Sequence, residues 1–525
     1  MNSAAFASSG FKDPRKLSFE RDWIRRAVLA SYWIIIILAF PFWWHLTSIE
    51  RLALPTSQIR ALVQNNIVFP ITVHFDASII QQNTNLISQV HTSLHDSAIN
   101  EPGRWRGVDL RLQDRNDEVT DKISSLYTVA LGEQTSIAHS RHLRVSKTDA
   151  QSGESRRVGW FEMHSTALTL ATRLSSILSD LIAPPESSTS HSQRVVQYSD
   201  HYRLAFTLLN EDATPNRFVE TWDVQTALAE FIFPLMSRLS TLHNFTVESQ
   251  VQYHAPLAFE PKRLAFGTTE ASGLTQEDLT VFINSAEWTL SSGVSNDPVL
   301  HFVLFVPSET HSPLKIIDGE GRPTNQNSFL LPQWGSIFIL NNELDSSSLH
   351  LSYNDLKPVF RNFATQLTAL LGVPPVPLGL SMEESSALSD WQLDTLLRRR
   401  ALQNVQGSQD TLHSIVKLVD QINNMPVGQV VRDDVLDALA SLHEAYRTAV
   451  ASPALALRWS SKALSMASRA FFNPGMLALL YFPAEHKYAV YTPLFASISV
   501  PLVVALIRDF MAWRRGSRDD GRRRD

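Results

Sequence analysis

The stretch AVLASYWIIIILAFPFWW, the 18 residues from Ala27 to Trp44, carries no charged side chain. At about 1.5 Å per residue, a helix of this length crosses a hydrocarbon layer of roughly 30 Å. The stretch ends in aromatic residues and not in a small-residue cleavage site, which favours a retained anchor over a cleaved signal peptide. We therefore predict a first transmembrane helix over residues 27–46, with a buried core helix as the other alternative.

A second uncharged stretch runs for 20 residues from Tyr488 to Ile507. It is the weaker of the two, because it contains Pro493, Pro501 and several small hydroxyl residues. Proline is tolerated in membrane helices whose neighbours satisfy the freed carbonyl groups, and small polar side chains favour close helix contacts. We predict a second transmembrane helix over residues 488–507 that packs against partner helices; a buried core helix is again the alternative.

Basic residues concentrate outside both stretches. Residues 1–26 hold six Lys and Arg against three acidic residues, and residues 508–525 hold seven Arg against four. The positive-inside rule then predicts two cytosolic tails, 1–26 and 508–525, with the chain between the two helices on the lumenal side. The portion between the tails holds 33 basic and 45 acidic residues. Such an acidic portion repels phosphates, so we expect no nucleic-acid partner.

The chain contains no cysteine. This excludes disulfides, cysteine-ligated zinc, iron–sulfur sites and a cysteine nucleophile. A lumenal domain without disulfides is compatible with the endoplasmic reticulum and unusual outside the cell. The one N-x-S/T sequon, Asn244-Phe245-Thr246, falls in the predicted lumenal portion, so Asn244 is the predicted glycosylation site.

Apolar segments with strand and helix periodicity alternate over residues 55–372, which predicts a lumenal α/β domain with a mixed sheet flanked by helices. The predicted strands are Ile67–Phe75, Leu126–Leu131, Tyr202–Leu209, Thr246–Tyr253, Leu300–Val306 and Ser336–Leu340. The predicted helices are Asn85–Ile99, Thr166–Ile182, Val224–Leu242 and Leu356–Leu371. Pro70 indicates an edge strand or a bulge in the first strand, and the Pro/Ser-rich residues 183–192 mark a possible seam.

Residues 383–486 contain Leu and Ala at helical spacing and lack strand patterns, which predicts a lumenal helical region leading to the second membrane helix. The expected helices are Leu388–Leu402, Thr411–Ile422, Val431–Val450 and Ala454–Phe471. Gly407, Pro426 and Pro453 are expected to separate them.

Motifs that carry chemistry are absent from the sequence. It has no Asp-x-Asp pair of the kind that holds a metal in many glycosyltransferases, no G-x-S-x-G, no P-loop and no G-x-G-x-x-G. His443-Glu444 resembles the start of a zinc helix, but Arg447 stands where the second histidine would be. We therefore name no catalytic, cofactor-binding or metal-binding residue and expect no cofactor.

Three weaker features favour structural interpretations. His91 and His95 are spaced to share a helix face, but they lack a local carboxylate and are expected to be solvated. The run Arg398-Arg399-Arg400 is expected to be a solvated charged face. Three tryptophans beside apolar segments are expected to anchor the core: Trp222, Trp288 and Trp334.

Seven segments of the sequence are distinctive when taken together: Trp43-Trp44, RLALP at 51–55, YRLAFTLLN at 202–210, WDV at 222–224, FLLPQWGS at 329–336, AFFNP at 470–474 and YFPAEHKYAVYTPLF at 481–495. In their order and spacing they resemble one family, the PIG-S subunit of the glycosylphosphatidylinositol (GPI) transamidase complex. The resemblance extends from about residue 20 to residue 510, with the same two-helix plan.

The resemblance implies an endoplasmic-reticulum complex that replaces the C-terminal signal of a precursor protein with a preassembled GPI lipid. It implies a separate caspase-like catalytic subunit and multipass membrane subunits as partners, with this chain as a non-catalytic structural subunit. Residues 482–495 are then expected to seat the lumenal stalk on the membrane. Two alternatives remain open: a lumenal enzyme of glycan or lipid metabolism with an unrecognised pocket, and a lumenal binding module for lipid or peptide.

Overall fold

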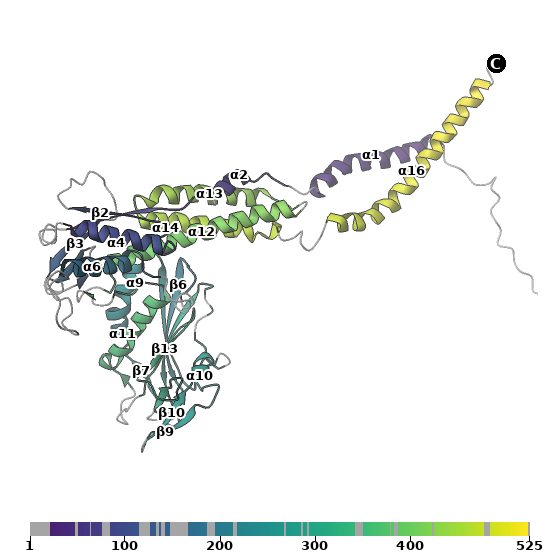
Figure 1. The fold of residues 1–525 in the computed structure, drawn as a ribbon. Coiled ribbons are helices and arrows are strands. Elements are labelled where there is room, and N and C mark those ends of the chain that lie inside the picture. Colours follow the sequence, from purple (N-terminus) through teal and green to yellow (C-terminus); the bar gives the residue numbers. More distant parts are fainter. Residues whose placement is uncertain are drawn as a thin grey trace, which may run out of the picture. The chain divides into compact units, whose positions relative to one another are not determined.

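The structure is a computed structural model, and it describes most of the chain (Figure 1). The described residues are 22–47, 51–62, 65–75, 85–114, 126–132, 136–137, 142–146, 166–185, 195–213, 218–266, 269–284, 287–290, 293, 295–341, 350–377, 380–382, 387–422, 425–476 and 484–522.

Two compact units make up the chain. One comprises residues 1–60, 411–436 and 466–525, and the other comprises residues 61–410 and 437–465. The long helices of the C-terminal half contribute residues to both units. They are α12 (Asp390–Gln421), α13 (Gln429–Ala449) and α14 (Pro453–Phe471).

The larger unit contains a six-stranded sheet in the order β16-β4-β5-β3-β1-β2, in which only β4 and β5 pair antiparallel. Apolar residues of two helices, α4 (Leu86–Asn100) and α6 (Thr166–Ile182), share its core with Trp391 of α12. The strands are β1 (Phe69–Phe75), β2 (Val108–Asp114), β3 (Leu126–Gly132), β4 (Ser136–Ile137), β5 (His142–Ser146) and β16 (Ser381–Met382).

Strand β1 lies inside this sheet and its register with β2 is unbroken, so Pro70 marks neither an edge strand nor a bulge, contrary to the prediction. Phe69 donates its backbone N–H to Gly107 at 2.8 Å, on the β2 side. The next peptide group points to the β3 side, where pairing begins only at Thr72. The N–H that Pro70 lacks therefore falls ahead of the β3 ladder, and no hydrogen bond between β1 and β3 is lost.

A second sheet of the same unit has five strands in the order β13-β14-β11-β6-β8, all parallel except β13 and β14. On one face α11 (Tyr353–Leu370) stacks Phe360 on Phe206 at 5.6 Å between ring centroids. Beside α11 lies the helical segment formed by α8 (Val224–Ala227), a π-helical turn (Leu228–Ile232) and α9 (Phe233–Leu239). The strands are β6 (His201–Asn210), β8 (Asn244–Gln252), β11 (Val299–Val306), β13 (Ser328–Leu331) and β14 (Gly335–Ile339).

The opposite face of the second sheet packs against a three-stranded sheet in the order β12-β10-β9. Its strands are β9 (Lys262–Phe266), β10 (Thr269–Leu274) and β12 (Leu314–Ile316), and α10 (Gln276–Thr280) follows β10. Short strands β7 (Thr221–Trp222) and β15 (His350–Leu351) form a separate parallel pair. The predicted mixed α/β architecture with a helical C-terminal region is confirmed.

The smaller unit contains the first and last helices, α1 (Asp22–Thr47) and α16 (Ala484–Arg522). Both stretches predicted to cross a membrane are therefore helical. Within the described residues, no helix has the combined length and apolar character that a membrane crossing requires.

Polar contacts connect the other segments of the smaller unit. Asp434 of α13 is 2% exposed and accepts a 2.9 Å hydrogen bond from Nε of Arg469 in α14. Before α2 (Thr56–Leu62), Arg51 donates to the carbonyl of Val419 at 2.8 Å, and Leu52 donates its N–H to Val427 at 3.0 Å. These contacts join the segment after α1 to the end of α12 and the start of α13.

Gly407 does not separate two helices, contrary to the prediction: α12 runs without a break through it to Gln421. A Cβ atom at Gly407 would lie 3.2 Å from Cδ1 of Leu464 in α14, so the glycine allows a close approach of the two helices. The predicted segments Leu388–Leu402 and Thr411–Ile422 are two parts of one helix. Of the possible seam, residues 186–192 lie outside the described part of the chain.

Candidate functional site

The second sheet reverses its strand order between β6 and β11. From β6 the chain continues to β8 on one side, and from β11 it continues to β14 on the other. In open parallel sheets the crevice at the carboxyl ends of two such strands is the usual ligand site. A ligand site in this sheet is therefore expected among the residues that follow β6 and β11.

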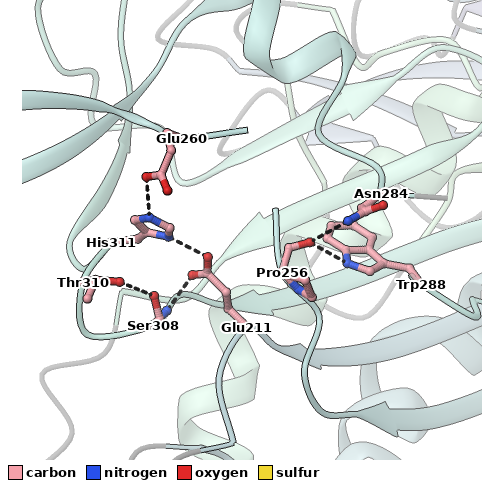
Figure 2. Close-up of polar contacts among 8 residues, drawn as sticks. All are labelled: Glu211, Pro256, Glu260, Asn284, Trp288, Ser308, Thr310 and His311. Carbon is pink, nitrogen blue, oxygen red and sulfur yellow. Dashed lines mark hydrogen bonds and ion pairs between the residues drawn. The ribbon is translucent and has the colours of Figure 1, made fainter. Parts of the chain in front are cut away.

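A carboxylate–histidine–carboxylate chain lies at this end of the sheet (Figure 2). Glu211, directly after β6, accepts hydrogen bonds from the Ser308 N–H at 2.7 Å and from Nδ1 of His311 at 2.6 Å. The other ring nitrogen, Nε2, lies 3.4 Å from Glu260. The Glu211 side chain is 6% exposed and that of Glu260 is 92% exposed, so these three side chains extend from the interior to the surface.

This arrangement lacks the pairing that nucleophilic catalysis requires. A catalytic serine needs its hydroxyl beside a basic ring nitrogen. Here the Ser308 hydroxyl contacts Thr310 Oγ1 at 3.0 Å, and both nitrogens of His311 face carboxylates. Within the described residues, no group of three His, Asp or Glu side chains is placed to hold a metal ion.

The segment after β8 closes the same end of the sheet. Ala255 donates its N–H to the carbonyl of Asn210 at 3.0 Å, and the Pro256 carbonyl accepts from Asn284 and Trp288, both at 3.2 Å (Figure 2). The polar groups at this crevice thus form hydrogen bonds with one another. We interpret these bonds as structural: they connect the ends of β6 and β11 to the segments around Pro256 and Glu260.

The arginine run predicted to be solvated is instead largely buried, so that prediction is wrong. Arg398 and Arg400 are 5% and 6% exposed, and Arg399 is partly buried. Arg398 donates to the Tyr127 hydroxyl at 2.9 Å, and that hydroxyl donates to Asp394 at 2.8 Å. Burial is the main cause that raises the pKa of Tyr127, so this phenol remains a neutral donor.

These buried groups satisfy the carbonyls at two helix ends. The last carbonyls of a helix have no partner within it, and cations near them are favourable. At the end of α6, Thr395 donates to the carbonyl of Leu181 at 2.8 Å and Arg398 to that of Ile182 at 3.4 Å. After α11, Arg400 donates to Leu371 at 3.1 Å. The run therefore fastens α12 to the ends of α6 and α11.

The other predicted residues lie at separate places. His91 and His95 are exposed on α4, with ring centroids 6.2 Å apart. Near His443, Glu444 pairs with Arg447 at 2.6 Å. Asn244, the predicted glycosylation site, is exposed at the first position of β8.

Of the tryptophans predicted to anchor the core, Trp288 is buried, 6% exposed, and lies in the apolar cluster of the second sheet. Trp334 is half-buried and stacks on His301 at 4.7 Å between centroids. Trp222 is half-buried with its centroid 6.0 Å from that of Phe360.

Comparison with known proteins supplies information that the geometry does not. A family model described as "PIG-S: Phosphatidylinositol-glycan biosynthesis class S protein" matches residues 30–516. A Mus musculus protein named "GPI-anchor transamidase component PIGS" is 31% identical over 541 residues, which cover 94% of this chain and 96% of the relative.

Two fungal relatives are similar over comparable lengths. A Schizosaccharomyces pombe protein named "GPI transamidase component PIG-S homolog" is 30% identical, covering 93% of this chain and 84% of the relative. A Saccharomyces cerevisiae protein named "GPI transamidase component GPI17" is 26% identical, covering 96% and 95%.

Proposed function

Because the chain belongs to the PIG-S family, we propose that it is an accessory subunit of GPI transamidase that supports the attachment of GPI anchors to precursor proteins. The observation that carries this proposal is similarity over nearly the whole length to relatives that are named as components of the transamidase. Similarity of that extent covers both the folded body and the terminal helices.

A non-catalytic role is the form of this function that the residues favour. The chain has no cysteine, so a thiol nucleophile must come from another subunit. At the crevice where an α/β protein usually binds its substrate, Glu211 and His311 bond to each other and not to a nucleophile. We propose a caspase-like catalytic subunit and multipass membrane subunits as the partners that this chain braces.

The exposed surface of the terminal helices supports a membrane anchor. Ile34, Ile35, Ile37 and Leu38 of α1 are 57–70% exposed, and consecutive positions on a helix point in different directions. An apolar surface on several sides suits lipid better than water. In α16 the exposed apolar residues include Val500, Val503, Val504 and Ile507.

We accordingly place the two spans at residues 27–46 and 488–507 of an endoplasmic-reticulum membrane. The Arg-rich tails 1–26 and 508–525 then lie in the cytosol, and the residues between the spans lie in the lumen. In this topology the α/β domain at 55–372 and the helical region at 383–486 are both lumenal.

Asn244 offers a direct test of this side of the membrane. Its side chain and that of Thr246 are exposed, as an N-linked glycan requires. We expect an endoglycosidase-sensitive form that is lost in Asn244→Gln and kept in Asn284→Gln, since Asn284 lies outside any sequon. An Asn244 that stays unmodified when the chain is made in its native membrane would contradict the glycosylation.

A lumenal enzyme remains the second candidate because of one cavity. A pocket of about 470 Å³ lies over β6 and β8, within the range of small-molecule sites. Its polar residues include Thr207, Glu248 and Gln250, and Glu248 is paired with Arg203 at 3.1 Å. An enzyme here would act on a glycan or lipid substrate without partner subunits.

The two candidates differ in what the purified chain does alone. The accessory role predicts no transfer of GPI to a precursor by this chain, and uncleaved precursors when a membrane extract is depleted of it. Adding the chain back should restore transfer. Turnover of a glycan or lipid by the isolated chain, abolished by Glu248→Gln and kept in Glu260→Gln, would favour the enzyme.

A further inference from the structure

Strand β8 presents one whole edge without a partner strand. It is the last strand of its sheet and pairs only with β6, and within the described residues no strand pairs with its other side. Asn244 donates its N–H to Asp200 at 2.8 Å, on the β6 side. Because peptide groups alternate along a strand, those of Phe245, Val247, Ser249 and Val251 point outward.

This edge has few of the features that usually prevent pairing with another chain. Natural edge strands are short, carry charged side chains (above all Lys) or Pro, or contain bulges. The nine residues of β8, NFTVESQVQ, contain no Lys, Arg, Pro or Gly, and Glu248 is their one charged residue. Other edges in this unit differ: β13 has four residues, β9 begins with Lys262 and Arg263, and β2 carries Asp109 and Arg111. The β8 edge is therefore unusual within its own fold.

The 470 Å³ pocket lies directly beside this edge. Paired residues share a face of the sheet, so Thr207, Gln250 and Glu248 point to the same side, where Thr289 and Leu290 form the far wall. Gln250 Nε2 donates to the Thr289 carbonyl at 2.7 Å, which fixes that wall against β8. A strand that paired with β8 would place alternate side chains on this face, next to the pocket.

We propose that an extended segment of another polypeptide pairs with the outer edge of β8 and places a polar side chain in this pocket. Main-chain hydrogen bonds to an open edge give affinity in such complexes, and adjacent pockets give specificity. The inference rests on the proposed function in one respect: the partner segment belongs to another subunit of the transamidase complex.

A second copy of this chain fits the edge less well than a different polypeptide. Antiparallel pairing of two β8 strands over their full length is centred on position 248, which sets Glu248 opposite Glu248. Like charges directly opposite each other destabilise a pair of strands. A partner strand with a neutral or basic residue at that position avoids the repulsion.

The absence of native cysteine allows a selective test. In Ser249→Cys the introduced thiol is the only one in the chain, at an exposed edge position. The full-length variant, assembled in its native membrane, would be labelled with a maleimide-benzophenone probe and irradiated. We expect a crosslink to a stretch of another transamidase subunit, identified by mass spectrometry, and none from Glu277→Cys on α10.

A proline substitution tests the strand pairing itself. Proline is tolerated in an edge strand when its missing N–H faces outward, and Ser249 meets that condition. Ser249→Pro should therefore keep the thermal unfolding of the wild type and lower the yield of the crosslinked partner segment, probed from Val247→Cys, at least tenfold. Ser249→Ala should keep that yield. If Ser249→Pro does not fold, Thr289→Trp, which obstructs the pocket, replaces it, with Thr289→Val as the control.

The outcomes separate this inference from the proposed function. An intact complex whose Ser249→Cys crosslinks reach only lipid, glycan or a second copy of the chain would overturn the inference and leave the accessory role standing. A wild-type chain that is recovered without other subunits would contradict the accessory role itself.

Discussion

The core of the larger unit contains a phenol and two charged groups, which belong to Tyr127, Asp394 and Arg398. The phenol accepts from Arg398 and donates to Asp394, and its ring lies 4.2 Å from that of Trp391. Buried charges are tolerated only when their hydrogen bonds are satisfied. The Tyr127 hydroxyl is therefore expected to contribute more to stability than its size suggests.

We predict that Tyr127→Phe lowers the free energy of unfolding by about 1–3 kcal/mol, because it removes a bond from each of two buried charged groups. Chemical denaturation of the full chain in detergent would measure the change. Tyr253→Phe is the matched control: Tyr253 is 38% exposed and makes one 3.2 Å bond to Glu220, so its loss should stay within about 0.5 kcal/mol. Equal effects in the two variants would contradict the role of the buried hydroxyl.

His243 makes stability depend on pH. It is 2% exposed, its Nδ1 lies 2.6 Å from the Ser199 carbonyl, and its pKa is lowered to about 4, mainly by burial. As the pH falls, His243 binds a proton near pH 6.5 in the unfolded chain and only near pH 4 in the folded chain. The stabilising contribution is therefore complete above pH 6.5 and is lost as the pH falls toward 4.

We expect His243→Gln to lose roughly 2 kcal/mol less stability than the wild type between pH 7 and pH 5. Urea unfolding at the two pH values would show this difference. Ser249→Ala, which changes an exposed residue and no titratable group, should keep the pH dependence of the wild type. Parallel losses in the wild type and His243→Gln would exclude His243 as the source.

The arginine run shows why single residues were the hardest part to predict. In the sequence, a run of three arginines looks the same whether its side chains are exposed to solvent or buried against other helices and strands. Here the partners are distant in sequence: Tyr127 lies 271 positions from Arg398, and Val196 lies 204 positions from Arg400. The sequence contains no local signal for such contacts. The Glu211–His311 pair was missed for the same reason, since 100 positions separate its members.

At the scale of elements, long apolar or periodic segments were predicted correctly. The strands β1, β3, β6, β8, β11 and β14 and the helices α4, α6, α11, α13 and α14 all lie where the pattern placed them. Several strands were missed, among them β2, β5, β9, β10 and β12. In β9 the charged residues Lys262 and Arg263 interrupt the alternation of apolar residues. Glycine is unfavourable inside helices, so the sequence predicts a helix end at Gly407. In the structure the helix continues through Gly407, where the missing side chain allows a close contact with α14.

The contact between α12 and α14 makes a prediction about Gly407. Gly407→Ala gains about 1 kcal/mol of helix propensity, and its Cβ needs only a small shift of Leu464, so stability should change by less than about 1 kcal/mol. Gly407→Leu overfills the same space and should destabilise by about 1–3 kcal/mol. Thermal unfolding of both variants tests this. A Gly407→Leu variant as stable as Gly407→Ala would mean that the helices do not pack closely there.

The terminal helices make a second prediction at this scale. Ile35→Lys combined with Leu38→Lys places two charges in the apolar surface of α1, at about 2.5–3.5 kcal/mol each on membrane-insertion scales. We expect less of the chain to resist extraction from membranes at alkaline pH. Ile35→Leu combined with Leu38→Ile should behave as the wild type. Unchanged resistance of the lysine variant would contradict the first span.

At the scale of the whole molecule, the composition excluded several classes of functional site, whereas the motifs established none. The chain has no cysteine, so it cannot supply a thiol nucleophile, and the charge distribution at its ends predicts the side of a membrane on which each segment would lie. Family membership rests on segments spread along the chain, which the match over residues 30–516 confirms. The surfaces that contact other subunits depend on the shapes of those subunits, so no pattern in this sequence predicts them.

The accessory role is tested most directly by reconstitution of GPI transfer with and without this chain. A membrane extract depleted of it should leave a precursor uncleaved, and the wild-type chain should restore transfer while remaining inactive by itself. Mild-detergent purification of the same chain should recover a caspase-like protease and multipass subunits in fixed proportion. Full transfer by the depleted extract, or transfer by the purified chain alone, would contradict the account.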